Sequence, residues 1–163
     1  MIIGRGDIAS ILNDREGAIF FVSGVSNSLE KRESEYEREY KLLSEQDKTQ
    51  CIFYISSITI DNKEKFEISR YLQHKKQMED YIKSSFKNYN IIRIGNIAWG
   101  SNPNTFLNYI KSKVKNNEPF FISDEYKFMI NEKQLLSLTD NLPIDSQNQI
   151  SVFGQMIKVK DLI

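Results

Sequence analysis

One continuous apolar run and two further strand-like segments constrain the fold of this chain more than any other feature. They are GAIFFVSGV at 17–25, CIFYISSITI at 51–60 and NIIRIGNIAW at 90–99. A strand with one face in water alternates apolar and polar residues, whereas an uninterrupted apolar run indicates a strand buried on both faces. Such strands occur almost only in parallel sheets that helices cover on both sides. The chain is therefore expected to form a parallel α/β sheet.

Segments with helical spacing separate and follow these runs. A charged helix is predicted at about 29–46, a second long helix at about 65–87 and an amphipathic helix at 104–116. Because strands and helices alternate, right-handed crossovers should join neighbouring parallel strands. A chain of 163 residues is expected to be one domain, here with a core at 1–115 and a reduced substrate-side segment at 116–163.

The composition argues against several classes of function. Lys and Arg number 22, as do Asp and Glu, so the chain is neutral and has no basic stripe for nucleic acid or a membrane surface. The single Cys51 cannot form an internal disulfide, and no Cys/His cluster has the spacing of a metal site. No apolar run reaches the length of a membrane span and no signal-peptide pattern is present, so a cytoplasmic protein is expected.

The segment GRGDIAS at 4–10 forms a candidate phosphate-binding turn between a strand and a helix. Gly4, Gly6 and Ala9 fit the pattern G-x-G-x-x-A, in which glycines let the backbone approach a pyrophosphate. A second strand should carry an acidic residue about 20 residues later, but Asp14 and Glu16 come too early. The adenosine half of such a site is therefore expected to be missing. The predicted cofactor contacts in this turn are Gly4, Arg5, Gly6, Asp7 and Ile8.

Ser57, Tyr71 and Lys75 form a candidate catalytic trio. Tyr71 and Lys75 are four residues apart, so they share one face of the predicted helix. A lysine cation near a phenol favours the phenolate and makes the tyrosine a better acid/base group. Ser57, which follows an apolar strand, could hold the substrate oxygen. A Tyr–Lys pair alone is common on exposed helices, and the preceding strand that ends in Ser-Ser makes this pair more specific.

In their order and spacing, these motifs resemble the extended short-chain dehydrogenase/reductase family, which includes sugar-nucleotide epimerases and dehydratases. FFVSGVSNS resembles the family's fourth strand, and CIFYISSITI resembles the strand of its catalytic Ser or Thr, with Ser57 in that place. YLQHKKQMEDYI matches the family's Tyr-x-x-x-Lys helix, including the glutamate Glu79. IIRIGNIAWG resembles the next strand and keeps Arg93, Asn96 and Gly100 of the family pattern.

The resemblance implies a role for each candidate residue. Tyr71 would be the general acid/base, and Lys75 would lower its pKa and contact the nicotinamide ribose. Ser57 and Asn96 would bind the substrate, while Ser23, Gly24 and Lys75 would contact NAD or NADP. Dehydratases of the family have an Asp-Glu pair after the serine, where this chain has Ile58 and Thr59, so dehydration is disfavoured.

The family also implies a fold, partners and alternatives. The expected fold is a minimal Rossmann-like sheet without the usual second and third strands. The expected function is an NAD(P)-dependent epimerase or keto-reductase that acts on a nucleotide-linked sugar in surface polysaccharide biosynthesis. A homodimer is expected through the helices at 29–46 and 65–87, with His74 on the surface and Cys51 inert in the core. Two alternatives stay open: a non-catalytic binding or assembly subunit, and a cofactor site that a partner chain completes.

Overall fold

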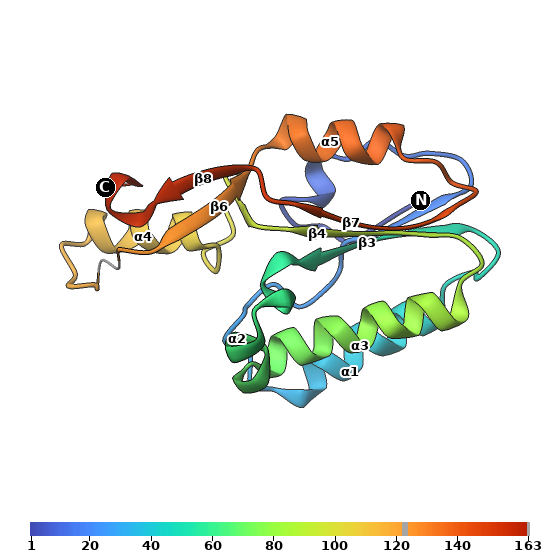
Figure 1. The fold of residues 1–163 in the computed structure, drawn as a ribbon, viewed down its shortest axis with the longest axis horizontal. Coiled ribbons are helices and arrows are strands. Elements are labelled where there is room, and N and C mark those ends of the chain that lie inside the picture. The colour runs from blue at the N-terminus through green and yellow to red at the C-terminus, as the bar shows by residue number, and fades with distance from the viewer. Residues whose placement is uncertain (122–123, 163) are drawn as a thin grey trace.

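The computed structural model describes residues 1–121 and 124–162. Its main sheet has five parallel strands in the order β1-β2-β3-β4-β7 (Figure 1). The three strand-like segments form the three central strands, which confirms the predicted parallel sheet. The strands of this sheet are β1 (Ile2–Ile3), β2 (Ala18–Phe21), β3 (Cys51–Ser57), β4 (Tyr89–Ile94) and β7 (Gln147–Val152).

Helices cover both faces of the sheet (Figure 1). Alternate side chains of the central strands supply two apolar clusters, as expected for strands buried on both sides. Phe20 and Phe53 pack with Leu135 on one face, whereas Tyr54 packs with Met78 on the other. The helices on the first face are η1 (Ala9–Ile11) and α5 (Glu132–Asn141), and those on the second are α1 (Glu33–Ser44) and α3 (Arg70–Ser85). This arrangement is Rossmann-like, as predicted.

The connections between strands do not all have the same hand. The chain passes from β1 to β2 over the face that η1 covers, and from β2 to β3 over the opposite face, which α1 covers. Both steps go in the same direction across the sheet, so the two connections have opposite hands. The expectation of right-handed crossovers throughout is therefore wrong. The first connection holds only a short 3₁₀ turn, whose Ile8, Ile11 and Leu12 pack on the α5 face.

The segment predicted as one helix at 65–87 is divided into two. β3 ends at Ser57 and is followed by η2 (Ile58–Asp61) and α2 (Lys63–Ile68). The break falls at Ser69, whose hydroxyl accepts a hydrogen bond from the Leu72 N–H and so caps the start of α3. An N-cap serine satisfies one of the free N–H groups at a helix start, which favours a new helix over a continuous one.

A small second sheet extends beyond the carboxyl end of β4 (Figure 1). In it β5 and β6 are parallel, and β6 and β8 are antiparallel. The predicted boundary at residue 115 stays a prediction, although α5 and β7 from the second part cover and extend the main sheet. The remaining elements are β5 (Asn96–Ile97), α4 (Phe106–Lys115), β6 (Tyr126–Ile130), β8 (Gln155–Lys158) and η3 (Val159–Leu162).

Candidate functional site

The motifs found in the sequence meet at the carboxyl edge of the main sheet, where open α/β sheets bind their ligands. Gly4 follows β1, Ser23 and Gly24 follow β2, and Asn96 follows β4. Gly4 has a φ of +139°, and a Cβ there would lie 2.5 Å from the Val22 carbonyl oxygen. Glycine is therefore needed at this position for the turn after β1 to pass against the turn after β2.

The loop at 99–102, which follows β5, binds the glycine turn. The Asp7 carboxylate accepts hydrogen bonds from the backbone N–H groups of Ser101 at 3.0 Å and Asn102 at 2.9 Å. The Trp99 indole N–H donates to the Asp7 carbonyl oxygen at 3.1 Å. Gly100 has a φ of +89°, and a Cβ there would lie 2.1 Å from Asp7 Cγ. The side chain of Asp7, a predicted cofactor contact, is therefore bound within the protein.

The other predicted contact residues differ in their exposure and in the groups that they bind. Arg5 and Gly6 are exposed, whereas Ile8 packs into the core. The Ser23 carbonyl oxygen accepts two hydrogen bonds from the Arg38 guanidinium at 3.1 Å. The Asn96 amide donates to the Phe128 carbonyl oxygen at 3.3 Å. Gly6 is the member of the glycine turn with open space beside it, since a Cβ there would meet no atom within 4 Å.

Lys75 lies near Tyr71, but its hydrogen bonds go elsewhere. The Lys75 Nζ is 5.7 Å from the centre of the Tyr71 ring. It donates to the Tyr54 hydroxyl at 3.2 Å and to Glu39 Oε1 at 3.4 Å. Lys75 is only 4% exposed. The structure thus brings the predicted tyrosine and lysine together and adds two groups that sequence reasoning missed.

Glu39 is fully buried and collects four donors. Its partners are the Val25 N–H at 2.8 Å, the Tyr54 hydroxyl at 2.8 Å, His74 Nε2 at 3.1 Å and Lys75 Nζ at 3.4 Å. The prediction that His74 lies on the surface is wrong, because its side chain is buried against this carboxylate and the Tyr36 ring. Its place on α3, one turn before the buried Met78, was the signal that the sequence offered.

The charges of this network support one another. Burial alone would raise the pKa of Glu39, but the Lys75 charge and the hydrogen bond to His74 outweigh burial and hold the pKa well below its usual range. Burial opposes the charge on Lys75, but Glu39 outweighs it and raises the lysine pKa. Burial, followed by the Glu39 charge, raises the pKa of Tyr54 well above that of an ordinary phenol. At neutral pH the site therefore holds a buried ion pair beside a neutral phenol.

The two serines at the end of β3 point to opposite faces of the sheet. Ser57 pairs in register with Ile94 of the α5-side cluster, and its hydroxyl accepts the Thr59 N–H at 3.2 Å. Ser56 alternates with Tyr54, so it faces α3 and Lys75. Its hydroxyl oxygen is buried and has no hydrogen-bond partner among the described residues. The structure therefore brings Ser56, and not Ser57, to the side of Tyr71 and Lys75.

Glu79 and Arg93 form a second buried ion pair. The guanidinium binds both oxygens of Glu79, at 2.9 and 2.6 Å, and also Asp61 at 2.7 Å. This pair ties α3 to β4 beside the candidate site. Cys51 is buried as predicted, and burial raises the pKa of its thiol to about 11. Within residues 1–121 and 124–162, no group of three or more His, Cys, Asp or Glu side chains is placed to hold a metal ion.

Lys75 and the turn at 23–25 lie in contact at this edge, since a Cβ on Gly24 would be 2.7 Å from Lys75 Nζ. The strand order never reverses, so the sheet has no topological switch point, and β1 is its edge. Among the described residues, no strand stands beyond β1 to support an adenosine, and η1 has only three residues. In the same part of the chain, no helix is both long and apolar enough to cross a membrane.

Solved structures with a similar fold include nucleotide-sugar epimerases and a reductase, and several are complexes with NAD. MoeE5, in complex with UDP-glucuronic acid and NAD, has a TM-score of 0.67 at 12% identity over 90% of this chain. UDP-glucose 4-epimerase from Thermotoga maritima has 0.64 at 13% over 90%, and the capsular polysaccharide assembling protein CapF from Staphylococcus aureus has 0.57 at 18% over 95%. The chain spans 60%, 58% and 44% of these three chains, respectively. No known family or curated protein matches the sequence.

Proposed function

We propose that this chain is an NAD(P)-dependent epimerase or keto-reductase domain that acts on a nucleotide-linked sugar, in cytoplasmic steps of surface polysaccharide synthesis. The buried Ser56 hydroxyl carries the proposal. A buried hydroxyl without a partner is costly in a folded protein, and a rotation of this side chain toward the carboxyl edge would let a ligand oxygen supply the missing hydrogen bond. Ser56 faces the helix of Tyr71 and Lys75, and neighbours with this fold include a complex with a UDP-sugar and NAD.

In this mechanism the nicotinamide group, when bound, accepts or supplies hydride. Tyr71 exchanges the proton of the reacting sugar hydroxyl, as a general acid/base. The Lys75 ammonium, 5.7 Å from the Tyr71 ring centre, contacts the nicotinamide ribose when the dinucleotide is bound. Ser56 donates a hydrogen bond to the same sugar oxygen and takes the place that the sequence assigned to Ser57. Dehydration has no acidic pair after these serines to support it.

The first test is titration with NAD⁺, NADH and their phosphorylated forms, by calorimetry and nicotinamide fluorescence. Micromolar binding is expected, and UDP-sugar turnover should then be measured. Ser56→Ala and Tyr71→Phe should each lower turnover by at least about tenfold, because each loses a bond to the reacting oxygen. Ser57→Ala is the matched control and should leave turnover nearly unchanged. No binding at millimolar dinucleotide would contradict the proposal.

A non-catalytic binding or assembly subunit is the second candidate. The edge position of β1 favours it, because an adenosine group then has no supporting strand. The carboxylate of Asp7 in the glycine turn also favours it, since it would repel a pyrophosphate. For such a subunit, the same titrations would show no dinucleotide binding, and Tyr71→Phe would leave its cellular role unchanged.

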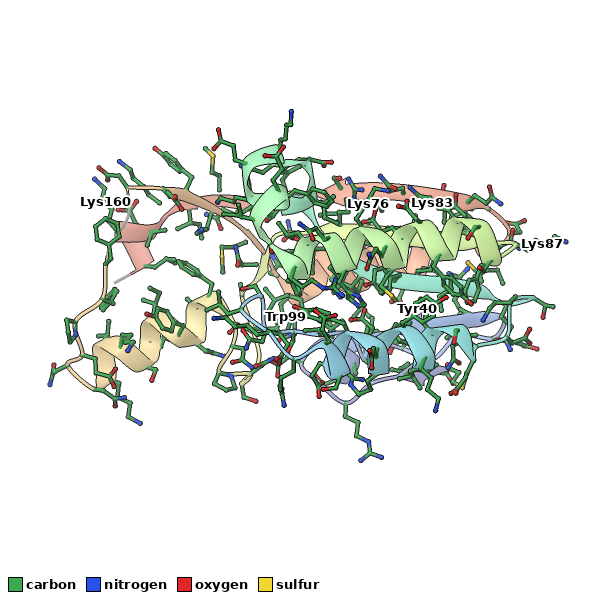
Figure 2. The ribbon with its side chains drawn as sticks, turned by 90° about the horizontal axis from the view of Figure 1, so that it is seen from below. Tyr40, Lys76, Lys83, Lys87, Trp99 and Lys160 are labelled. Carbon is green, nitrogen blue, oxygen red and sulfur yellow. The ribbon has the colours of Figure 1, made fainter. Side chains whose placement is uncertain are left out.

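We also infer that two copies associate through α1 and α3. The two helices lie side by side, with Tyr40 between them (Figure 2). Tyr40 is 48% exposed and its ring lies 5.1 Å from that of Tyr81. A shallow groove of about 200 Å³ runs beside it, lined in part by Tyr36, Arg70 and Gln77. Exposed tyrosine and arginine side chains are enriched at interfaces, which supports a second copy as the occupant of this face.

A further inference from the structure

The Glu39 carboxylate is the point where four segments of the chain meet. Its Oε1 accepts from Tyr54 on β3 and from Lys75 on α3. Its Oε2 accepts from the Val25 N–H, in the turn after β2, and from His74 on α3. Glu39 itself comes from α1. Because both oxygens have two partners each, neither the lysine nor the turn can move without breaking a bond to this carboxylate.

The turn at 23–25, which follows β2, lies in contact with the ion pair of Glu39 and Lys75. A Cβ on Gly24 would lie 2.7 Å from Lys75 Nζ and 3.0 Å from Glu39 Oε1. An ammonium group has three N–H donors. Within the described parts of the chain, Lys75 uses one for Tyr54 and one for Glu39, so the third remains for a ligand at the turn.

The ion pair of Lys75 and Glu39 differs in geometry from the ion pair of Arg93 and Glu79 on the same face of the sheet. Arg93 and Glu79 make a bidentate contact at 2.9 and 2.6 Å, the geometry that holds two elements together most firmly. Lys75 and Glu39 make a single contact at 3.4 Å, with a phenol as the second acceptor. A buried ion pair is often no better for stability than apolar side chains of similar volume. Because the Lys75–Glu39 pair is not expected to stabilise the fold more than apolar side chains would, we expect its role to be the placement of the lysine.

We propose that Glu39 is a positioning residue for the reaction centre. It holds the Lys75 ammonium and the turn at 23–25 as one unit, so that the lysine directs its remaining N–H toward the nicotinamide ribose. This inference rests on the proposed function, because it assumes that a dinucleotide binds at this edge.

A matched pair of variants tests the proposal. Glu39→Gln and Glu79→Gln each neutralise a fully buried carboxylate that is paired with a cation on this face. The NADH and NADPH dissociation constants are measured for each, with circular dichroism as the control for folding. Glu39→Gln should weaken binding by about tenfold or more, the loss expected for one charged hydrogen bond. Glu79→Gln should change it by less than about twofold, and equal losses would overturn the proposal.

A double-mutant cycle shows whether Glu39 acts through Lys75. Lys75→Met removes the positioned group, so Glu39→Gln should add no further loss of affinity in the double variant. Additive losses would mean that Glu39 acts by another route, which contradicts the proposal. The double variant also removes both charges, so it remains a usable protein if the single Glu39→Gln change prevents folding.

A readout without cofactor separates this inference from the proposed function. In ¹⁵N spectra of lysine ammonium groups, the wild type and Glu79→Gln should show a slowly exchanging signal from the held Lys75, which is distinct from that of Lys48, whose ammonium donates to three backbone carbonyl oxygens. The Lys75 signal should vanish in Glu39→Gln and in Lys75→Met, and fade in Glu39→Asp, which keeps the charge but withdraws the carboxylate. A Lys75 signal that persists in Glu39→Gln overturns this inference alone. If the Lys75 signal is lost in Glu39→Gln and the wild type binds no dinucleotide, Glu39 does hold Lys75. In that case the proposed function is overturned, and with it the catalytic part of the inference.

Discussion

Neutralising Glu79 should destabilise the fold far more than neutralising Asp61, although both carboxylates bind the same arginine. Arg93 donates two hydrogen bonds to Glu79, at 2.9 and 2.6 Å, and one to Asp61 at 2.7 Å. The Glu79 side chain is 0% exposed and that of Arg93 is 7% exposed, whereas Asp61 is 64% exposed. Glu79 is therefore the partner that compensates for the buried charge.

The size of the effect follows from this burial. Removing one partner of a buried ion pair costs about 3–5 kcal/mol, because the other charge is left without compensation. Since Asp61 still contacts the guanidinium, Glu79→Gln should lower the free energy of unfolding by about 3 kcal/mol. Asp61→Asn should cost less than about 1 kcal/mol, as for exposed pairs. For a chain of this length, 3 kcal/mol corresponds to a fall in melting temperature of about 6–12 °C.

Urea unfolding followed by the fluorescence of Trp99, the only tryptophan, measures both variants. The midpoint should move while the slope with urea stays constant, which identifies a change in stability and not in the denatured state. Similar losses for Glu79→Gln and Asp61→Asn would refute the reasoning, because burial would then not decide the cost.

Three further predictions concern the buried network and the dimer. Gly24→Ala should weaken dinucleotide binding severalfold with little loss of fold, because the new methyl group displaces Lys75 Nζ; unchanged affinity by fluorescence titration would count against that contact. The pKa of Glu39 is lowered from the 4.5 of an unperturbed glutamate, so its contribution to stability is complete above that pH and is lost as the pH falls below it. Urea unfolding between pH 3 and 7 should therefore show a shallower acid slope for Glu39→Gln than for the wild type. Tyr40→Glu should shift the protein to monomer in light scattering, and an unchanged mass would place the dimer interface elsewhere.

The strands were predictable because a strand that is buried on both faces consists mostly of apolar residues. GAIFFVSGV and CIFYISSITI contain few polar residues, and no surface helix or half-exposed strand needs such a run. The helix boundary at Ser69 was also visible in principle, as an N-cap serine between two helical segments, but the continuous helical spacing concealed it.

Most of the buried polar network could not be predicted from local patterns. His74 and Lys75 are polar residues on a charged helix, and the local sign of burial was the place of His74 one turn before Met78. Their burial depends on Glu39, which is 35 and 36 residues away and lies equally hidden in a charged helix. The sequence also could not decide whether Ser56 or Ser57 faces α3, because neighbouring residues of a strand point to opposite faces and the register was not known.

At the end of the sheet opposite β1, β7 presents an open edge of six residues with the sequence QNQISV. Native proteins usually protect such an edge with lysine, proline or a bulge, because free backbone groups recruit strands from other molecules. This strand has no charged residue, and stacked Asn and Gln side chains add to that risk. At high concentration, the protein should therefore aggregate by pairing of β7 edges, a route distinct from the α1–α3 dimer. Ser151→Lys should raise solubility without changing the size of the dimer.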